Sequence, residues 1–289
     1  MKKSLWILAT IALFFAGDRA AGLLLKKAID SSQFRYSRMY AGAAQSDILL
    51  VGNSRGLTFY QPYIEKITGK KTFNLSYNGM PIDLAAELIK DYLAQYKSPK
   101  TMILDITMCD RFNAQMISGF NLYTPYSKNI SELIHKNDDS AFYAGQLSHL
   151  YRYNSEIFQR SLFYLNKSDE DWLLDREINE FMMANVQQEE PYKIGYTSEL
   201  IDHLKAIVEL AESKGVKVHL VINPYFPAFG KQVENLKDLK QAVEVATALV
   251  VRDYSLAVQE EKGFADYQHL NKFGAQLYLD QLKKDGLLD

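Results

Sequence analysis

The chain has 289 residues, of which 47% are hydrophobic, and a formal net charge of -2. That is enough apolar material for one domain with an insertion, or for two small domains. The balanced charge provides no basic stripe for binding nucleic acid and no acidic tract typical of disorder. The single cysteine, Cys109, excludes an internal disulfide. No cluster of Cys and His has metal-ligand spacing, so we expect neither a metal nor another cofactor.

The pattern of the first 29 residues is typical of a membrane segment. A basic start, Met1-Lys2-Lys3, precedes an apolar run over residues 4–17, and Asp18 and Arg19 follow it. The run is short for a full span of about 20 residues, and counting on to Leu25 would place both charges inside the helix. Residues 1–29 are therefore predicted to form an uncleaved signal anchor.

Two other interpretations of this segment stay open. One is a cleaved signal peptide, although Ala16-Gly17-Asp18 is a poor cleavage site. The other is a buried N-terminal helix of a cytosolic protein, which the Lys-Lys start and the flanking Trp6 disfavour. An anchor or a signal peptide would place the rest of the chain outside the cytoplasm.

After a polar linker, predicted to be helical over residues 30–46, short apolar runs alternate with segments of helical periodicity. Strands are predicted at 48–51, 72–76, 101–106, 216–222 and 248–252, and helices at 56–68, 83–96, 197–214, 236–246 and 271–284. Asp83 is the expected N-cap of the second helix, and Gly215 the expected C-cap of the third. This alternation predicts an α/β fold with a parallel sheet and right-handed crossovers.

The alternation stops between residues 111 and 196. This stretch is rich in Tyr and Phe and reads as a largely helical insertion into an α/β domain that covers residues 47–289. Its aromatic side chains could line a sugar-binding groove or face a partner or a membrane. For most of them, a place in the insertion's own core is the better expectation.

Ser54 is the candidate nucleophile. It lies in Gly52-Asn53-Ser54-Arg55-Gly56, directly after the first predicted strand and before a helical pattern. A serine on such a turn points toward the mouth of the sheet, where the free N–H groups of a helix start favour an oxyanion. The alternative is an ordinary helix-capping serine.

Asp266 and His269 form the candidate acid and base. They lie three residues apart, just before the last helical pattern, and Asn271 follows them. An aspartate held against one ring nitrogen fixes the tautomer, which leaves the other nitrogen free to take a serine proton. The alternative is an incidental His beside a helix-start Asp. The other four histidines have no motif around them and are His135, His149, His203 and His219.

These segments resemble the SGNH (GDSL-like) hydrolase superfamily, and most closely its membrane-anchored bacterial branch of polysaccharide acetyltransferase and esterase-like proteins. The family's first block, Gly-Asp-Ser, is matched by Gly52 and Ser54, with Asn53 in the Asp position. The second block ends in an oxyanion glycine, a role that the resemblance gives to Gly79. Its last block, Asp-x-x-His, is matched by Asp266 and His269.

The third block departs from the family pattern. It should read Gly-x-Asn-Asp, but Thr107-Met-Cys-Asp110 occupies its place, with Cys109 where the oxyanion asparagine belongs. Because cysteine is a poor hydrogen-bond donor, another donor could replace it, and the candidates are Asn53, Asn78 and Asn113. Arg55 could grip an anionic substrate group, although a solvated arginine at a helix start is the better expectation.

The resemblance implies a three-layer α/β/α sandwich of the flavodoxin-like SGNH type, with an N-terminal membrane helix. It also implies a Ser-His-Asp enzyme that cleaves or transfers an acyl group, most simply an acetyl ester of a cell-surface glycan. The partners would be an acylated glycan or an acyl-donor protein, and the membrane through the N-terminal helix. The catalytic domain would lie on the extracytoplasmic side of a bacterial cytoplasmic membrane.

Two rival interpretations remain. Gly52-Asn-Ser-Arg-Gly56 also matches the G-x-S-x-G nucleophile elbow of α/β-hydrolases. That fold, however, places strands ahead of the elbow and takes its acid and histidine from separate loops. The second rival is a membrane-anchored domain with a degenerate site, which would bind polysaccharide or act as a scaffold in envelope modification or export. Cys109 favours this rival, and the intact set of Ser54, Asp266 and His269 disfavours it.

Overall fold

The computed structural model describes residues 2–169 and 173–289, and it divides into two compact units. One unit combines Met1–Ala43 with Ala114–Asp169, and the other combines Ala44–Asn113 with Glu170–Asp289. Residues 170–172 of the insertion expected over 111–196 lie outside the described residues, as does Met1 of the basic start. Residues 173–196 of that stretch belong to the second unit, and residues 114–169 belong to the first.

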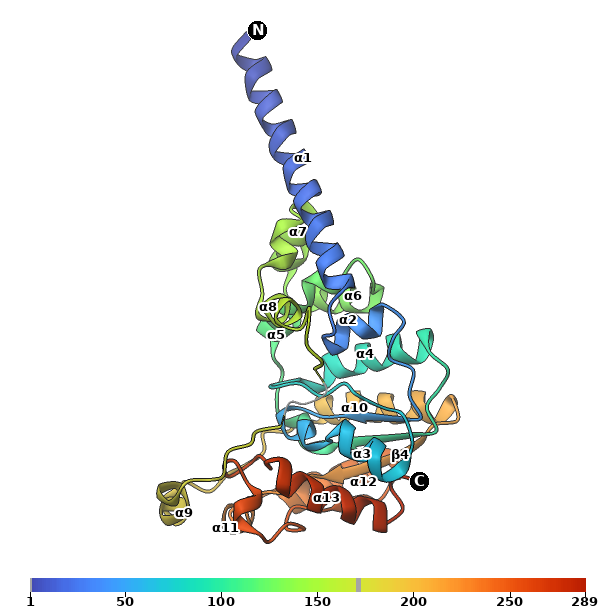
Figure 1. The fold of residues 1–289 in the computed structure, drawn as a ribbon, viewed down its shortest axis with the longest axis vertical. Helices are drawn as coiled ribbons and strands as arrows, with labels where there is room; N and C mark the ends of the chain where they lie inside the picture. Colours follow the sequence, from blue (N-terminus) through green and yellow to red (C-terminus); the bar gives the residue numbers. More distant parts are fainter. Residues whose placement is uncertain (1, 170–172) are drawn as a thin grey trace. The chain divides into compact units, whose positions relative to one another are not determined.

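A parallel five-stranded sheet forms the centre of the second unit (Figure 1). Its strand order is β2-β1-β3-β4-β5. The strands are β1 (Ile48–Val51), β2 (Thr72–Asn74), β3 (Thr101–Asp105), β4 (Lys217–Ile222) and β5 (Val251–Asp253). This is the order of flavodoxin-like sheets, whose ligands bind beyond the carboxyl ends of the strands where the order reverses. In this chain the reversal is at β1, which lies between β2 and β3.

Helices cover the sheet and confirm the predicted three-layer α/β/α class. Right-handed crossovers put α3 on one face and α4, α10 and α12 on the other. Consistent with this, α10 packs against α4 and α12, while α13 packs against α3. The helices of this unit are η1 (Ser54–Thr58), α3 (Gln61–Thr68), α4 (Ile82–Gln95), η2 (Ile106–Asp110), α9 (Glu180–Asn185), η5 (Val186–Gln188), α10 (Ser198–Ser213), α11 (Pro227–Gly230), α12 (Leu236–Thr247), η6 (Glu261–Gly263) and α13 (Lys272–Lys284).

Three local expectations are corrected. The helix predicted over 56–68 is divided into the 3₁₀ helix η1 and helix α3, because Phe59 and Tyr60 between them have non-helical backbone. Asp83 is not the N-cap of α4, since Pro81 takes that position and Asp83 lies buried in the first turn. The last strand begins at Val251 because α12 runs on to Thr247 and ends in the left-handed Ala248.

The first unit is entirely helical in its described residues. It contains α1 (Lys2–Asp30), α2 (Arg35–Tyr40), α5 (Ala114–Gly119), η3 (Phe120–Tyr123), α6 (Lys128–Asn137), α7 (Asp139–Leu147), η4 (Leu150–Tyr153) and α8 (Glu156–Phe163). The linker predicted as one helix over 30–46 consists instead of the end of α1, the short α2 and irregular backbone. Aromatic side chains contribute to this unit's core, and the buried ones include Phe34, Tyr36, Phe120 and Tyr123. The expectation that most aromatic residues of the insertion are buried is wrong, because Phe112, Tyr143, Tyr151 and Phe163 are exposed.

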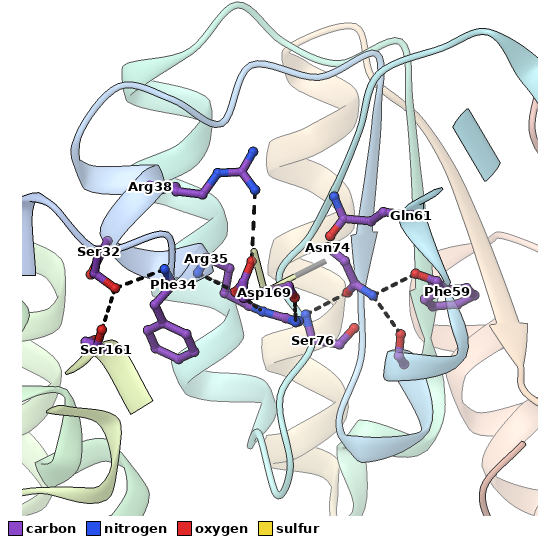
Figure 2. A network of polar contacts seen from close by, with 12 residues as sticks. Ser32, Phe34, Arg35, Arg38, Phe59, Gln61, Asn74, Ser76, Ser161 and Asp169 are labelled. Atoms are coloured by element: carbon purple, nitrogen blue, oxygen red, sulfur yellow. Dashed lines mark hydrogen bonds and ion pairs between the residues drawn. The ribbon is translucent and has the colours of Figure 1, made fainter. Parts of the chain in front are cut away.

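Polar contacts tie the segment after α1 to the end of the insertion (Figure 2). The Ser32 hydroxyl donates to the Ser161 carbonyl at 2.6 Å and accepts the N–H of Phe34. The carboxylate of Asp169 accepts Arg35 Nε at 3.1 Å and lies 3.9 Å from Arg38 Nη1. Because Asp169 and Arg35 are both buried, this ion pair fixes the residues around α2 on the insertion.

Helix α1 is long and apolar enough to cross a membrane by length and composition. Its candidate span, Lys3–Asp30, has 28 residues, and its most apolar 18-residue window has a mean hydropathy of 1.6. Only 11% of that window is buried among the residues that the structure describes, so most of its apolar side chains are exposed.

Candidate active site

Ser54 lies at the carboxyl end of β1, where the sheet order reverses. It opens η1, and the side chain of Asn53 caps this 3₁₀ helix by accepting the N–H of Arg55 at 2.9 Å. The turn is held from β2, because Asn74 Nδ2 donates to the carbonyls of Gly56 and Phe59 at 3.0 Å (Figure 2). A Cβ at Gly52 would lie 2.8 Å from the Gly56 Cα, so this tight turn requires glycine.

His269 and Asp266 meet Ser54 in one chain of hydrogen bonds. His269 Nε2 lies 2.9 Å from Ser54 Oγ, and His269 Nδ1 lies 2.8 Å from Asp266 Oδ1 and 3.0 Å from Oδ2. Asp266 Oδ1 also accepts the N–H groups of Gln268 and His269, which fixes the loop around the carboxylate. The structure therefore brings Ser54 together with His269, which lies 215 residues later in the sequence, and with Asp266, three residues before His269.

The surroundings of Asp266 keep its carboxylate charged. Burial alone would raise the pKa of Asp266, but hydrogen bonds from the His269 ring and from two backbone N–H groups hold it below its ordinary value. Arg176 Nη2 lies 3.7 Å from Asp266 Oδ2, and this ion pair is weak because the Arg176 side chain is 66% exposed. A charged Asp266 fixes the His269 tautomer in which Nδ1 carries the proton and Nε2 is free to accept one.

A cavity of about 340 Å³ opens beside this chain of hydrogen bonds. Ser54, Asp266 and His269 line it together with two polar residues, Thr58 and Asn78, and with Gly79. Its apolar wall consists of Leu57, Leu173, Leu174 and Leu270. The volume is at the low end of the range of about 300–1,000 Å³ for small-molecule sites.

Two of the four leucines in this wall could not be found from the sequence. Leu173 and Leu174 lie in the stretch that the sequence assigns to the insertion, with no motif around them. Their position comes from pairing with the His269 loop: Leu174 forms a parallel bridge to Asn271, and its carbonyl accepts the N–H of Lys272 at 3.2 Å. The Asn271 side chain secures the same loop by donating to the Lys262 carbonyl at 2.7 Å.

Gly79 occupies a turn with a left-handed backbone, φ +68°. Its carbonyl accepts Asn113 Nδ2 at 3.1 Å. Gly79 and the exposed Asn78 both line the cavity, so these two predicted residues lie at the site with Ser54. Asn113 reaches the site through this bond to Gly79.

The side chains of Asn53 and Arg55 are buried and bond to backbone groups of the chain. Asn53 is buried and uses both ends of its amide, with Oδ1 on the Arg55 N–H and Nδ2 near the Thr107 carbonyl at 3.4 Å. Arg55 is only 4% exposed, so the expected solvated arginine is wrong. Its guanidinium donates to the carbonyls of Asn223 and Pro224 and lies 3.4 Å from the ring centre of Tyr225.

Arg55 compensates for a buried acid. Asp105, at the end of β3, is completely buried; burial raises its pKa, and the positive charge of Arg55 opposes that rise. Asn223 links the same region, since it donates to the Arg55 carbonyl at 3.1 Å and accepts the Tyr278 hydroxyl at 2.7 Å. Arg55 thus stabilises the carboxyl ends of the strands beneath Ser54, and it does not line the cavity.

Cys109 is fully buried in η2, and burial raises the pKa of its thiol. A neutral thiol is a weak donor. Among the described residues, no group of three or more His, Cys, Asp or Glu side chains is placed to hold a metal ion. The side chains at the cavity supply a hydrogen-bonded serine, an imidazole and a carboxylate beside a partly apolar wall.

Comparisons with known proteins give similarities of fold. No family model matches the chain, and no curated protein matches it. A Bacteroides fragilis protein provisionally described as an acylhydrolase aligns with 88% of this chain and 96% of its own, at 11% identity and a TM-score of 0.42. A GDSL-like lipase from Bacteroides thetaiotaomicron aligns with 88% and 97%, at 12% identity and 0.42.

A third solved structure, from Streptococcus pneumonia, is provisionally described as a platelet activating factor. It aligns with 98% of this chain and 99% of its own, at 14% identity and a TM-score of 0.43. At such low identities and TM-scores, these likenesses do not establish a shared reaction. The side chains around Ser54 have to support any function assigned to this chain.

Proposed function

We propose that this protein is a serine-dependent enzyme that cleaves or transfers an acyl ester. The observation that carries the proposal is the hydrogen-bonded chain from Ser54 through His269 to Asp266, placed at the sheet's reversal point and beside a cavity. A nucleophile within hydrogen-bond reach of a base, with that base oriented by a third group, is the arrangement of nucleophilic acyl-transfer enzymes.

In the proposed reaction, Ser54 Oγ attacks the ester carbonyl while His269 Nε2 takes the hydroxyl proton. The N–H groups of Ser54 and Gly79 stabilise the oxyanion of the tetrahedral intermediate. The intermediate collapses to an acyl-serine as His269 returns the proton to the leaving alkoxide. Water or a sugar hydroxyl then attacks the acyl-serine with His269 again as the base, which releases the acyl product and restores Ser54.

The proposed substrate is a short acyl ester, most simply an acetyl ester, on a cell-surface glycan. The leucine wall suits the acyl group, and Asn78 and Thr58 provide polar contacts for the alcohol part. The acyl acceptor or donor would be an acylated glycan or an acyl-donor protein. Helix α1 would anchor the chain in a bacterial cytoplasmic membrane, and its Lys-Lys start favours placing the remainder on the extracytoplasmic side.

Hydrolysis of p-nitrophenyl acetate by the full chain in detergent tests the proposal. We expect Ser54→Ala and His269→Ala each to lower the rate by at least about 10³-fold. Ser213→Ala and His135→Ala, which change exposed side chains far in sequence from the site, should leave it unchanged. A rate that survives Ser54→Ala in folded protein would overturn the proposal.

One observation favours a second function. Cys109 occupies the position where the resembled family has its oxyanion asparagine, and its buried neutral thiol cannot replace that donor well. A chain with this deficit could bind an acylated glycan without cleaving it. Folded wild-type protein that binds an acetylated oligosaccharide in calorimetry, yet shows no hydrolysis and no transfer, would support this binding module.

A further inference from the structure

The charged pair in the middle of α1 is covered by the insertion. The carboxylate of Asp18 accepts the Ser148 hydroxyl at 2.6 Å and the backbone N–H groups of His149 and Leu150 at 2.8 and 3.0 Å. Arg19 pairs with Asp18 at 2.7 Å and donates to the Leu147 carbonyl at 3.2 Å. Asp18 is consequently only 4% exposed. We refer to residues 147–150 as the Asp18 cradle.

Glycine allows the cradle to lie close to the helix. A Cβ at Gly22, one turn after Asp18, would come within 2.4 Å of the His149 Cβ. The contacts of α1 with η4 and with α8 continue this packing. One side of α1 from Asp18 onward is thus joined to the insertion, while Leu23 and Leu24 remain 64% and 71% exposed.

Because the insertion covers Asp18 and Arg19, a longer part of α1 can lie in the bilayer. Alone, residues 4–17 are too short for a bilayer whose hydrocarbon core is about 30 Å thick. With Asp18 satisfied by the cradle, the segment extends from Leu5 to Leu25, 21 residues that span about 31 Å as a helix. An aspartate at this depth is tolerated when protein groups satisfy it, which the cradle does.

The surface around the cradle is apolar as well. Leu147, Leu150 and Tyr151 are 67%, 43% and 42% exposed, and Tyr143, one turn earlier on α7, is 60% exposed. On α8, the helix that contacts α1, Phe163 is 53% exposed, with Lys167 Nζ 4.0 Å from the centre of its ring. Exposed leucines and tyrosines, with a lysine nearby, are the residues that membrane interfaces favour.

We propose that residues 143–151 form a second membrane contact, which inserts into the headgroup and acyl boundary of the bilayer that α1 enters. This inference rests on the proposed anchoring by α1 and not on the reaction of Ser54. Asp18 precedes Leu25, where that segment ends, by seven residues, about 10 Å along the helix axis. A cradle at that depth matches the 5–10 Å to which interfacial segments sink. The occupant of the apolar surface is therefore lipid, continuous with the lipid around α1.

Depth-dependent quenching tests the inference. Leu147→Cys in the full chain, labelled with a polarity-sensitive fluorophore and reconstituted in vesicles of phosphatidylcholine and phosphatidylglycerol, reports on the cradle. The buried native Cys109 should escape labelling. Leu13→Cys on α1 is the lipid reference, and Val245→Cys on α12, at a side chain that is 79% exposed, is the water reference.

We expect lipids with a nitroxide near the headgroup to quench the label at residue 147 severalfold more than the label at residue 245, and aqueous iodide to quench it severalfold less. Equal iodide quenching at 147 and 245, with residue 13 protected, would overturn the second contact while leaving the anchor intact. Protection of residue 147 from both quenchers would also overturn it, since a protein would then cover the surface. Ester hydrolysis by the same samples reports separately on the proposed reaction.

Discussion

A substitution at Asp266 can separate an effect on turnover from an effect on stability. Its carboxylate accepts the His269 ring N–H and two backbone N–H groups, so an amide in its place would keep much of the loop geometry. With Asp266→Asn, however, the Nδ1–H tautomer of His269 loses its charged acceptor, and an amide NH2 that faces Nδ1 favours the opposite tautomer. We expect the turnover of p-nitrophenyl acetate to fall by roughly 10³–10⁴-fold with little change in stability.

Arg176→Gln is the matched control for Asp266→Asn. Arg176 touches the same carboxylate from 3.7 Å, but its side chain is mostly exposed, and such surface pairs contribute about 0–1 kcal/mol. Turnover should change by no more than a few fold. Equal losses in the two variants would mean that the charge near the site matters and the His269 hydrogen bond does not.

Gly79 combines backbone strain with a position at the cavity. A Gly79→Ala side chain would meet only Asn113 Nδ2 at 3.4 Å, so the left-handed φ of +68° is the main cost, about 1–2 kcal/mol of unfolding free energy. If the Gly79 N–H binds the oxyanion, the shifted backbone should also lower turnover by up to about 10²-fold.

Gly215→Ala separates these two effects. Gly215 has φ +74° and open space around its Cβ position, so the strain is similar, but it lies at the end of α10. Chemical denaturation should show comparable destabilisation in both variants, with turnover lowered only in Gly79→Ala. Unchanged turnover in Gly79→Ala would remove Gly79 from the proposed oxyanion site.

At the scale of elements, the sheet was predictable because its strands are short apolar runs enclosed by turn residues. The predicted bounds match β1 and come within two residues of β2, β3 and β4 at either end. Errors arose where helix ends depend on backbone detail, as at Tyr60 and Pro81, or where α12 extended past its predicted end. These features change a helix end without changing hydrophobic periodicity, which is the signal that the predictions used.

His219 on β4 makes stability depend on pH. Burial, together with the charges of Lys217 and Arg252, lowers its pKa from 6.5 to about 4. Between these values the unfolded chain binds more protons than the folded chain, so stability rises with pH in that window and is lost as pH falls from 6.5 toward 4. His219→Gln should flatten this part of the profile.

Thermal unfolding at a series of pH values checks the expectation for His219. His135→Gln is the control, because the His135 side chain is 47% exposed and its contacts, with Asp139, Phe142 and Tyr143, lie at the surface of the helical unit. The control should retain the wild-type slope between pH 6.5 and 4. Identical slopes in all three proteins would show that His219 does not titrate differently on folding.

At the scale of the whole molecule, the sequence predicts the residues around Ser54 but not the wall of their cavity. Ser54, Asp266 and His269 carry recognisable spacing and lie at the ends of predicted elements. Leu173 and Leu174 line the cavity only because residues 174 and 271 pair, and the Asp18 cradle forms between segments 130 residues apart. Contacts of this range leave no periodic or local signal in a single sequence.

The central claim is that His269 activates Ser54. Labelling with a fluorophosphonate tests it most directly, because this reagent reacts with an activated serine and does not require the natural substrate. We expect one adduct per folded chain, mapped to Ser54 by mass spectrometry. Ser54→Ala should abolish the adduct and His269→Ala should slow its formation sharply. Folded wild-type protein that takes up no reagent, or labelling that persists in Ser54→Ala, would contradict the account.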